Sequence, residues 1–160
     1  MTAKDLLSKK VFWIISLAFA FQFLSMMGVL SFLPIHASKM GLDKTWILFG
    51  LPVKQYVFAY ALSAFGGVLG KVTFGYLIDI MKAAYPSMIA MFLQAIGIFG
   101  LTYFSEPSIF LLSAFIFGLG FGGAMPLMTT CFLKTFGAHN LGKARGISSP
   151  IVSPLQPIGV

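Results

Sequence analysis

Residues 55–80 read QYVFAYALSAFGGVLGKVTFGYLIDI, and this stretch decides the class of the protein. Before Asp79 it carries a single charge, Lys71. At about 1.5 Å of rise per residue, residues 55–78 are long enough to cross a hydrocarbon layer roughly 30 Å thick. We therefore predict a membrane-spanning helix with one cation about 12 Å inside its boundary at Asp79.

The whole chain has the composition of a membrane protein. Of its 160 residues, 58% are hydrophobic and 9% are charged, and the mean hydropathy is +0.93. Soluble domains carry about 25% charged residues. The net charge of +7 does not indicate nucleic acid as a partner, because the basic residues are spread singly or in pairs between apolar runs.

The chain shows no pattern typical of an enzyme. Cys131 is its single cysteine and lies inside an apolar run, so we expect a small buried residue rather than a reactive thiol. We find no nucleophile–base set, no metal-ligand spacing and no phosphate-cradling loop. We therefore expect no catalytic residue, no metal and no cofactor. His36 and His139 are expected to be solvated.

The apolar runs predict an all-α fold, a polytopic transmembrane helix bundle. Four complete spans are expected at about residues 11–33, 55–78, 86–104 and 108–133. A fifth run, at about 147–160, has roughly 15 residues and falls short of the 20 or so that crossing requires. We expect a chain cut off in mid-helix, and a 34–54 connection whose apolar 46–51 part lies along the outer interface.

The basic residues orient these spans. One side of the membrane would carry seven of them and the other side three. Because cytoplasmic loops are enriched in Lys and Arg, we expect the N-terminus in the cytoplasm, in the plasma (inner) membrane. The seven are Lys4, Lys9, Lys10, Lys82, Lys134, Lys143 and Arg145, and the three are Lys39, Lys44 and Lys54.

Lys71 is the main candidate for a binding residue. A cation at this depth costs at least about 2.5–3.5 kcal/mol on insertion scales and normally faces protein or a water-filled pathway. Snorkelling to the interface and a structural pair with a carboxylate are the alternatives. No acidic residue lies inside any expected span, so a partner would have to come from outside this chain.

Glycines recur at helical spacing in two of the spans. Gly66 and Gly70 are four residues apart in one span, and Gly118 and Gly122 are four apart in another. Small residues at this spacing let membrane helices approach closely, which is the simplest interpretation. Such faces can also rock against their neighbours, as alternating access requires.

The end of the second span resembles a known family. Gly75, Leu77 and Asp79, followed by Lys82, are similar to the signature between helices two and three of each half of the major facilitator superfamily. The arginine that usually follows the aspartate is Ile80 here, which favours the C-terminal half. The Lys9–Trp13 opening and the run GLGFGGAMPL at 118–127 resemble helices seven and ten of oxalate/formate-antiporter and monocarboxylate-transporter carriers.

The resemblance implies a function and partners. It implies secondary transport of a small organic anion, a monocarboxylate or dicarboxylate, with Lys71 on the carboxylate and Gly75, Asp79 and Lys82 as a gating motif. Proton symport and anion exchange both stay open, and the missing N-terminal half of the carrier would be a partner besides lipid. The alternatives are a carrier of the same fold for an uncharged or cationic solute, and a small non-transporting helical membrane protein.

The charge asymmetry gives a topology that labelling can test. Single cysteines replace Lys39 and Lys143 in a Cys131→Ser background, and intact cells are treated with an impermeant thiol reagent. We expect labelling at position 39 alone, because residue 143 would lie in the cytoplasm. Labelling at 143 but not at 39 would overturn the orientation.

Overall fold

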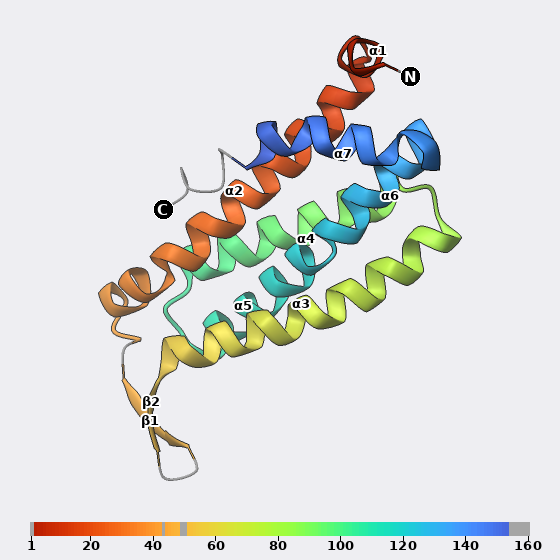
Figure 1. Ribbon diagram of the computed structural model, residues 1–160. Helices are drawn as coiled ribbons and strands as arrows, with labels where there is room; N and C mark the ends of the chain where they lie inside the picture. Colours follow the sequence, from red (N-terminus) through yellow and green to blue (C-terminus); the bar gives the residue numbers. More distant parts are fainter. Residues whose placement is uncertain (1, 43, 49–50, 154–160) are drawn as a thin grey trace.

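The computed structural model describes residues 2–42, 44–48 and 51–153, which form a bundle of long helices (Figure 1). A two-stranded antiparallel hairpin projects from one end of the bundle. The elements are α1 (Ala3–Leu7), α2 (Lys10–Lys39), β1 (Thr45–Leu48), β2 (Leu51–Lys54), α3 (Gln55–Ile80), α4 (Ala84–Tyr103), α5 (Pro107–Gly122), α6 (Ala124–Phe136) and α7 (Ala138–Val152).

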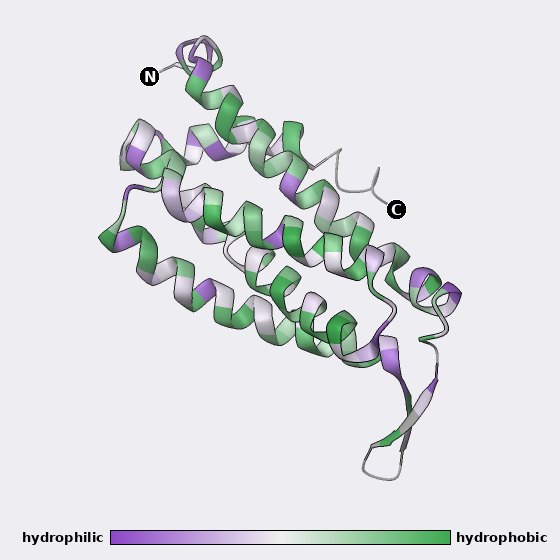
Figure 2. Ribbon diagram, turned by 180° about the vertical axis from the view of Figure 1, so that it is seen from behind, coloured by the Kyte–Doolittle hydropathy of each residue, from purple (hydrophilic) through white to green (hydrophobic). Residues whose placement is uncertain are grey.

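The bundle is the predicted all-α polytopic membrane architecture. Four helical stretches in the described residues are long and apolar enough to span, and each expected span overlaps one of them: Lys10–Lys39, Gln55–Ile80, Ala84–Tyr103 and Pro107–Phe136. Hydrophobic residues predominate along the helices (Figure 2), and many large ones are exposed. Phe92 is 67% exposed and Val72 is 70% exposed, as suits side chains that face lipid rather than water.

Helix α5 is the centre of the arrangement. It packs against α3 on one side and against α4 on the other, and these are the two most extensive helix contacts of the bundle. Helix α6 continues from α5 and contacts α2, α3 and α7. Helix α7 crosses α2 near the end at which the chain begins (Figure 1).

The first span is longer than the sequence predicts. Helix α2 runs through Pro34 to Lys39, so the first six residues of the expected 34–54 connection are helical. The end of that connection forms the hairpin, with Thr45 opposite Lys54. The expected 34–54 connection therefore contains the end of a helix and a strand pair.

A hydrogen bond from α3 explains how α2 tolerates its proline. Pro34 has no N–H, so it leaves the carbonyl of Leu30, four residues earlier, without its helical donor. The hydroxyl of Tyr60 donates to that carbonyl from α3. In a membrane a free carbonyl is costly, and a neighbouring helix is one of the ways in which it is satisfied.

The fourth expected span and the segment that follows it also differ from the prediction. The run at 108–133 divides at Gly123 into α5 and α6. Pro126 is the cause, because it offers no N–H to the carbonyl of Gly122. A turn at Gly137, with φ of +78°, leads directly into α7, so most of the expected 134–146 connection is helical. The expected fifth span overlaps α7 as far as Val152, and its remainder from 154 lies outside the described residues.

The Tyr60–Leu30 hydrogen bond predicts a dependence on Pro34. Tyr60→Phe should lower the free energy of unfolding by about 1 kcal/mol, because it strips the Leu30 carbonyl of its donor. In a Pro34→Ala background the helix regains its own N–H donor, and the same substitution should cost less than about 0.5 kcal/mol. Unfolding in mixed detergent micelles measures both values.

Tyr56→Phe, on the same helix, serves as the control. An equal loss from Tyr60→Phe in both backgrounds would show that the hydroxyl does not stand in for the missing N–H.

Candidate functional site

Lys71 lies on the flank of the α3–α5 interface. Its neighbour Gly70 is buried against α5, whereas the Lys71 side chain is exposed. It is nine residues from the end of α3 at Ile80, about 14 Å along the helix axis at 1.5 Å per residue. The surface on which Lys71 lies is therefore deep inside the span.

The residues that pack on the two sides of α5 show that Lys71 lies near the middle of the span. A Cβ atom on Gly70 would lie 2.3 Å from the Leu119 carbonyl oxygen of α5. The next residue, Gly120, has Gln94 against it, since a Cβ there would lie 2.4 Å from the Gln94 nitrogen. Gln94 is in the middle of α4, a helix of 20 residues. Lys71 and Gln94 thus lie at one level on opposite sides of α5.

Within the described residues, no carboxylate lies close enough to Lys71 for an ion pair. The chain has four acidic residues, of which Asp79 is the nearest in sequence. Asp79 is eight residues further along α3, about 12 Å along the axis. The Lys71 ammonium group is therefore available to an anion that approaches this face.

The residues of the expected gating motif lie at the end of α3. Gly75 has open space where a Cβ would be, and Asp79 and Lys82 are exposed. The helix end itself is compensated by a residue that the motif does not contain. Lys134 of α6 donates through Nζ to the carbonyl of Ile78 at 2.5 Å. A cation there opposes the partial negative charge of the helix C-terminus.

The glycines expected to pack helices lie where backbones nearly touch. A Cβ on Gly66 would lie 2.4 Å from the Phe115 carbonyl oxygen. One on Gly118 would lie 2.1 Å from the Ser63 carbonyl oxygen, and one on Gly122 would lie 2.1 Å from that of Gly67. Side chains cannot be accommodated at these distances, so α3 and α5 meet backbone to backbone.

A buried amide cluster links α2 to α4 and α5. Gln94 Nε2 donates to the Gln22 carbonyl oxygen at 3.0 Å and to Ser25 Oγ at 2.7 Å. Gln22 Nε2 donates to the Gly120 carbonyl oxygen at 3.4 Å. Gln22 and Gln94 are 5% and 2% exposed, and the Oε1 atom of each has no hydrogen-bond partner among the described residues. The sequence alone could not tell whether these glutamines join helices or line a cavity.

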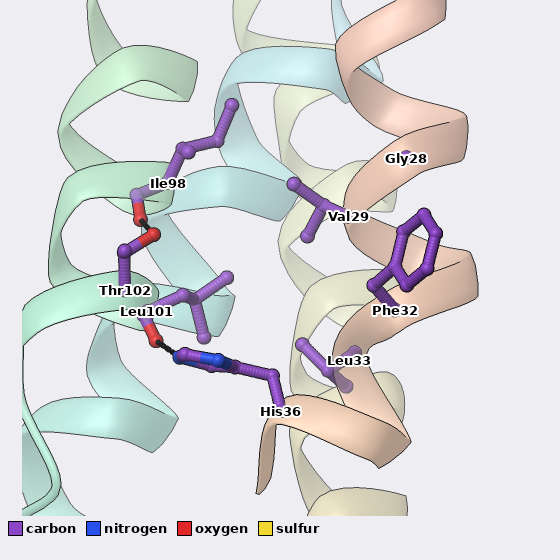
Figure 3. Close-up of a pocket in the computed structure, with 8 residues that line it drawn as sticks. All are labelled: Gly28, Val29, Phe32, Leu33, His36, Ile98, Leu101 and Thr102. Atoms are coloured by element: carbon purple, nitrogen blue, oxygen red, sulfur yellow. Dashed lines mark hydrogen bonds between the residues drawn. The ribbon is translucent and has the colours of Figure 1, made fainter. Parts of the chain in front are cut away.

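His36 is half-buried, whereas the sequence led us to expect a fully solvated side chain. It lies on α2, and its Nε2 atom lies 3.1 Å from the Leu101 carbonyl oxygen of α4 (Figure 3). It lines a cavity of about 240 Å³ between the two helices. The expected span ended at about residue 33, whereas α2 continues to Lys39 and carries His36 against α4. His139 is exposed on α7.

The other chemistry of the described residues is limited. Cys131 is buried, with its Sγ atom 3.5 Å from Ser87 Oγ. Searched over the part of the chain that the structure describes, His, Cys, Asp and Glu form no group of three that could hold a metal ion. The buried polar residues of the described part of the chain are serines and glutamines, and Lys71 is exposed on the flank of α3.

A bundle of long apolar helices of this kind is the architecture of an integral membrane protein. The sequence matches the Major Facilitator Superfamily over residues 2–155. The chain therefore belongs to this superfamily, whose members are membrane transporters and not enzymes. Neither the curated proteins nor the solved structures gave a match.

The close approach of α3 and α5 predicts opposite effects of two alanine substitutions on α3. Gly70→Ala should destabilise the protein by about 1–3 kcal/mol, because the added methyl meets the backbone of Leu119. Gly75→Ala is the matched control and should be neutral or stabilising by up to about 1 kcal/mol, since it has space and alanine favours helix. Unfolding in mixed micelles compares the two. Equal stabilities would contradict the backbone contact.

Proposed function

We propose that this chain forms one bundle of a secondary carrier that moves a small organic anion, a monocarboxylate or dicarboxylate, by alternating access. The observation that carries the proposal is Lys71, an exposed cation near mid-height of α3 with no carboxylate in ion-pair distance among the described residues. A cation placed so deep normally marks a substrate or ion pathway. The resemblance of the sequence to oxalate/formate and monocarboxylate carriers supports the same substrate class.

The proposal assigns roles to the remaining site residues. The close contact between α3 and α5 keeps the two helices together as one unit during transport. Its residues are Gly66, Gly70, Gly118 and Gly122. Gly75, Asp79 and Lys82 form the gating motif at the cytoplasmic end. Asp79 and Lys82 are exposed and Gly75 has open space beside it, which leaves the motif available to a second bundle.

A second bundle, the N-terminal half, completes the site in this proposal. In carriers of this type the substrate lies near the bilayer midplane between two repeats. The bundle described here supplies one wall, on which Lys71 is exposed. We place the carrier in the plasma (inner) membrane with the N-terminus in the cytoplasm, because of the distribution of its basic residues. Proton symport and anion exchange are both compatible with a single cationic site.

Lys71 variants test the proposal in the carrier assembled with its second bundle. Lys71→Gln should reduce the uptake of small carboxylates by at least about 100-fold, because the charge-assisted hydrogen bonds to the carboxylate are lost. Lys71→Arg should keep uptake within about tenfold, with altered preference among carboxylates, since guanidinium offers a fixed fork. Radiolabelled uptake and thermal stability are measured on the same proteoliposome preparations.

Lys44→Gln, which removes a lysine outside the expected spans, is the control for charge alone. If Lys71 instead forms a structural ion pair with an acidic residue of the second bundle, Lys71→Gln would lower the free energy of unfolding by about 3–5 kcal/mol. Neutralising that acidic residue would then restore the free energy of unfolding. Full carboxylate uptake by Lys71→Gln would end the assignment of Lys71 to the substrate.

A further inference from the structure

A second cation of the bundle lies in a small pocket that the proposed transport site does not use. The pocket, of about 140 Å³, lies where α7 meets α2 and α6. Arg145 of α7 lines it, although the sequence marks this residue only as a topology signal. The complete lining is Phe23, Met125, Met128, Arg145, Ser148, Ser149, Val152 and Ser153.

The pocket has a polar side and an apolar side. Arg145, Ser149 and Ser153 bring a guanidinium group and two hydroxyl groups from one helix, and the two hydroxyl oxygens are 3.5 Å apart. Phe23 from α2 and the two methionines of α6 supply the apolar side. Ser148, fully buried, donates its hydroxyl to the Arg145 carbonyl oxygen at 3.0 Å and so faces its own helix rather than the pocket.

The apolar side of the pocket belongs to two candidate membrane spans, whereas α7, which carries Arg145, is not one of them. Phe23 is 13 residues beyond Lys10 at the start of α2, about 20 Å along the helix axis. Met125 and Met128 belong to the first half of α6, next to the break at Gly123. Arg145 is exposed, so its guanidinium group is accessible to an anion that enters the pocket, and the apolar wall beside it strengthens their attraction.

Among the residues that the structure describes, no carboxylate fills this role. Among the described residues none forms an ion pair with Arg145, and α1 is the element near α7 that carries an acid. That acid, Asp5, is already engaged, since the Thr2 N–H donates to its carboxylate at 2.7 Å. Backbone and side-chain hydrogen bonds with Thr2 hold the pKa of Asp5 below its usual value.

We propose that the pocket between α2, α6 and α7 binds one oxyanion group, a carboxylate or a phosphate, at Arg145. The guanidinium group donates a charged fork, and the hydroxyls of Ser149 and Ser153 add neutral donors. The apolar side accepts a short hydrocarbon part. A volume of 140 Å³ is below the roughly 300–1,000 Å³ of typical ligand pockets, so the bound group is small or is the head of a larger lipid. The site is independent of Lys71.

Titration calorimetry on the protein in nanodiscs of phosphatidylcholine tests this site with butyrate, inorganic phosphate and butyramide. Butyramide has the shape of butyrate without its charge and should not bind. Arg145→Gln should weaken butyrate or phosphate binding by about tenfold to 100-fold, because hydrogen bonds to a charged group are lost. Lys143→Gln removes a cation two residues away on the same helix and should leave binding unchanged. The comparison is repeated in a Lys71→Gln background, so that the carboxylate site proposed at Lys71 does not contribute to the measured binding.

A further arm separates a soluble anion from a lipid headgroup. If phosphatidylglycerol nanodiscs, but neither soluble anion, raise the thermal unfolding temperature of the wild type and not of Arg145→Gln, the oxyanion belongs to a lipid. Ser149→Ala with Ser153→Ala keeps the charge and should weaken the same binding several-fold, which preserves the test if Arg145→Gln does not fold.

Two results would overturn the proposal. One is equal binding of butyrate and butyramide. The other is that the wild type, Arg145→Gln and the double serine variant show the same calorimetric binding of the soluble anions and the same change in unfolding temperature with phosphatidylglycerol.

Discussion

The bundle depends on the close approach of α5 to two neighbours at once. On one face Gly118 and Gly122 meet the backbone of α3, and on the other Gly120 meets the backbone of α4. Glycines of the neighbouring helices also lie against α5: a Cβ on Gly97 of α4 would lie 2.4 Å from the Phe117 nitrogen. In lipid there is little hydrophobic gain from joining helices, so association depends on packing and on hydrogen bonds. Contact between backbones brings many atoms of the two helices together, which increases their dispersion attraction and lets polar groups of one helix reach the other.

This contact determines where the polar groups of the bundle can be. With α5 filled by backbone on two sides, Lys71 lies outside the α3–α5 seam and the Gln22–Gln94 cluster lies on the α4 side. Helix α2 joins the layer through that cluster, through the Tyr60–Leu30 hydrogen bond and through His36. Cavities lie along its seam with α4, including one of about 320 Å³ beside Gln22 and Gln94. The layer of α3, α5 and α4 is therefore packed more closely than its junction with α2.

Three prolines show how a membrane helix accommodates a lost backbone donor. Pro34 is compensated by a hydroxyl from another helix, and α2 stays helical. Pro126 coincides with a division of the span at Gly123, against which Phe74 packs. Pro107 lies at the first turn of α5, where its N–H would have no helical partner in any case. The outcome at each proline depends on what its neighbours offer to the free carbonyl.

The sequence by itself determined the class of the protein, because apolar length is a local property. Four runs long enough to cross a membrane predicted the all-α bundle, and the Gly75–Asp79 segment predicted the superfamily. Only the tertiary structure decided where these helices end and what their polar residues do. Helix α2 passes Pro34 because Tyr60 is in reach, and His36 is half-buried because the helix goes on. Arg145 borders a pocket because α7 turns back at Gly137 onto α2 and α6. Such contacts join residues tens of positions apart, and periodicity carries no information about them.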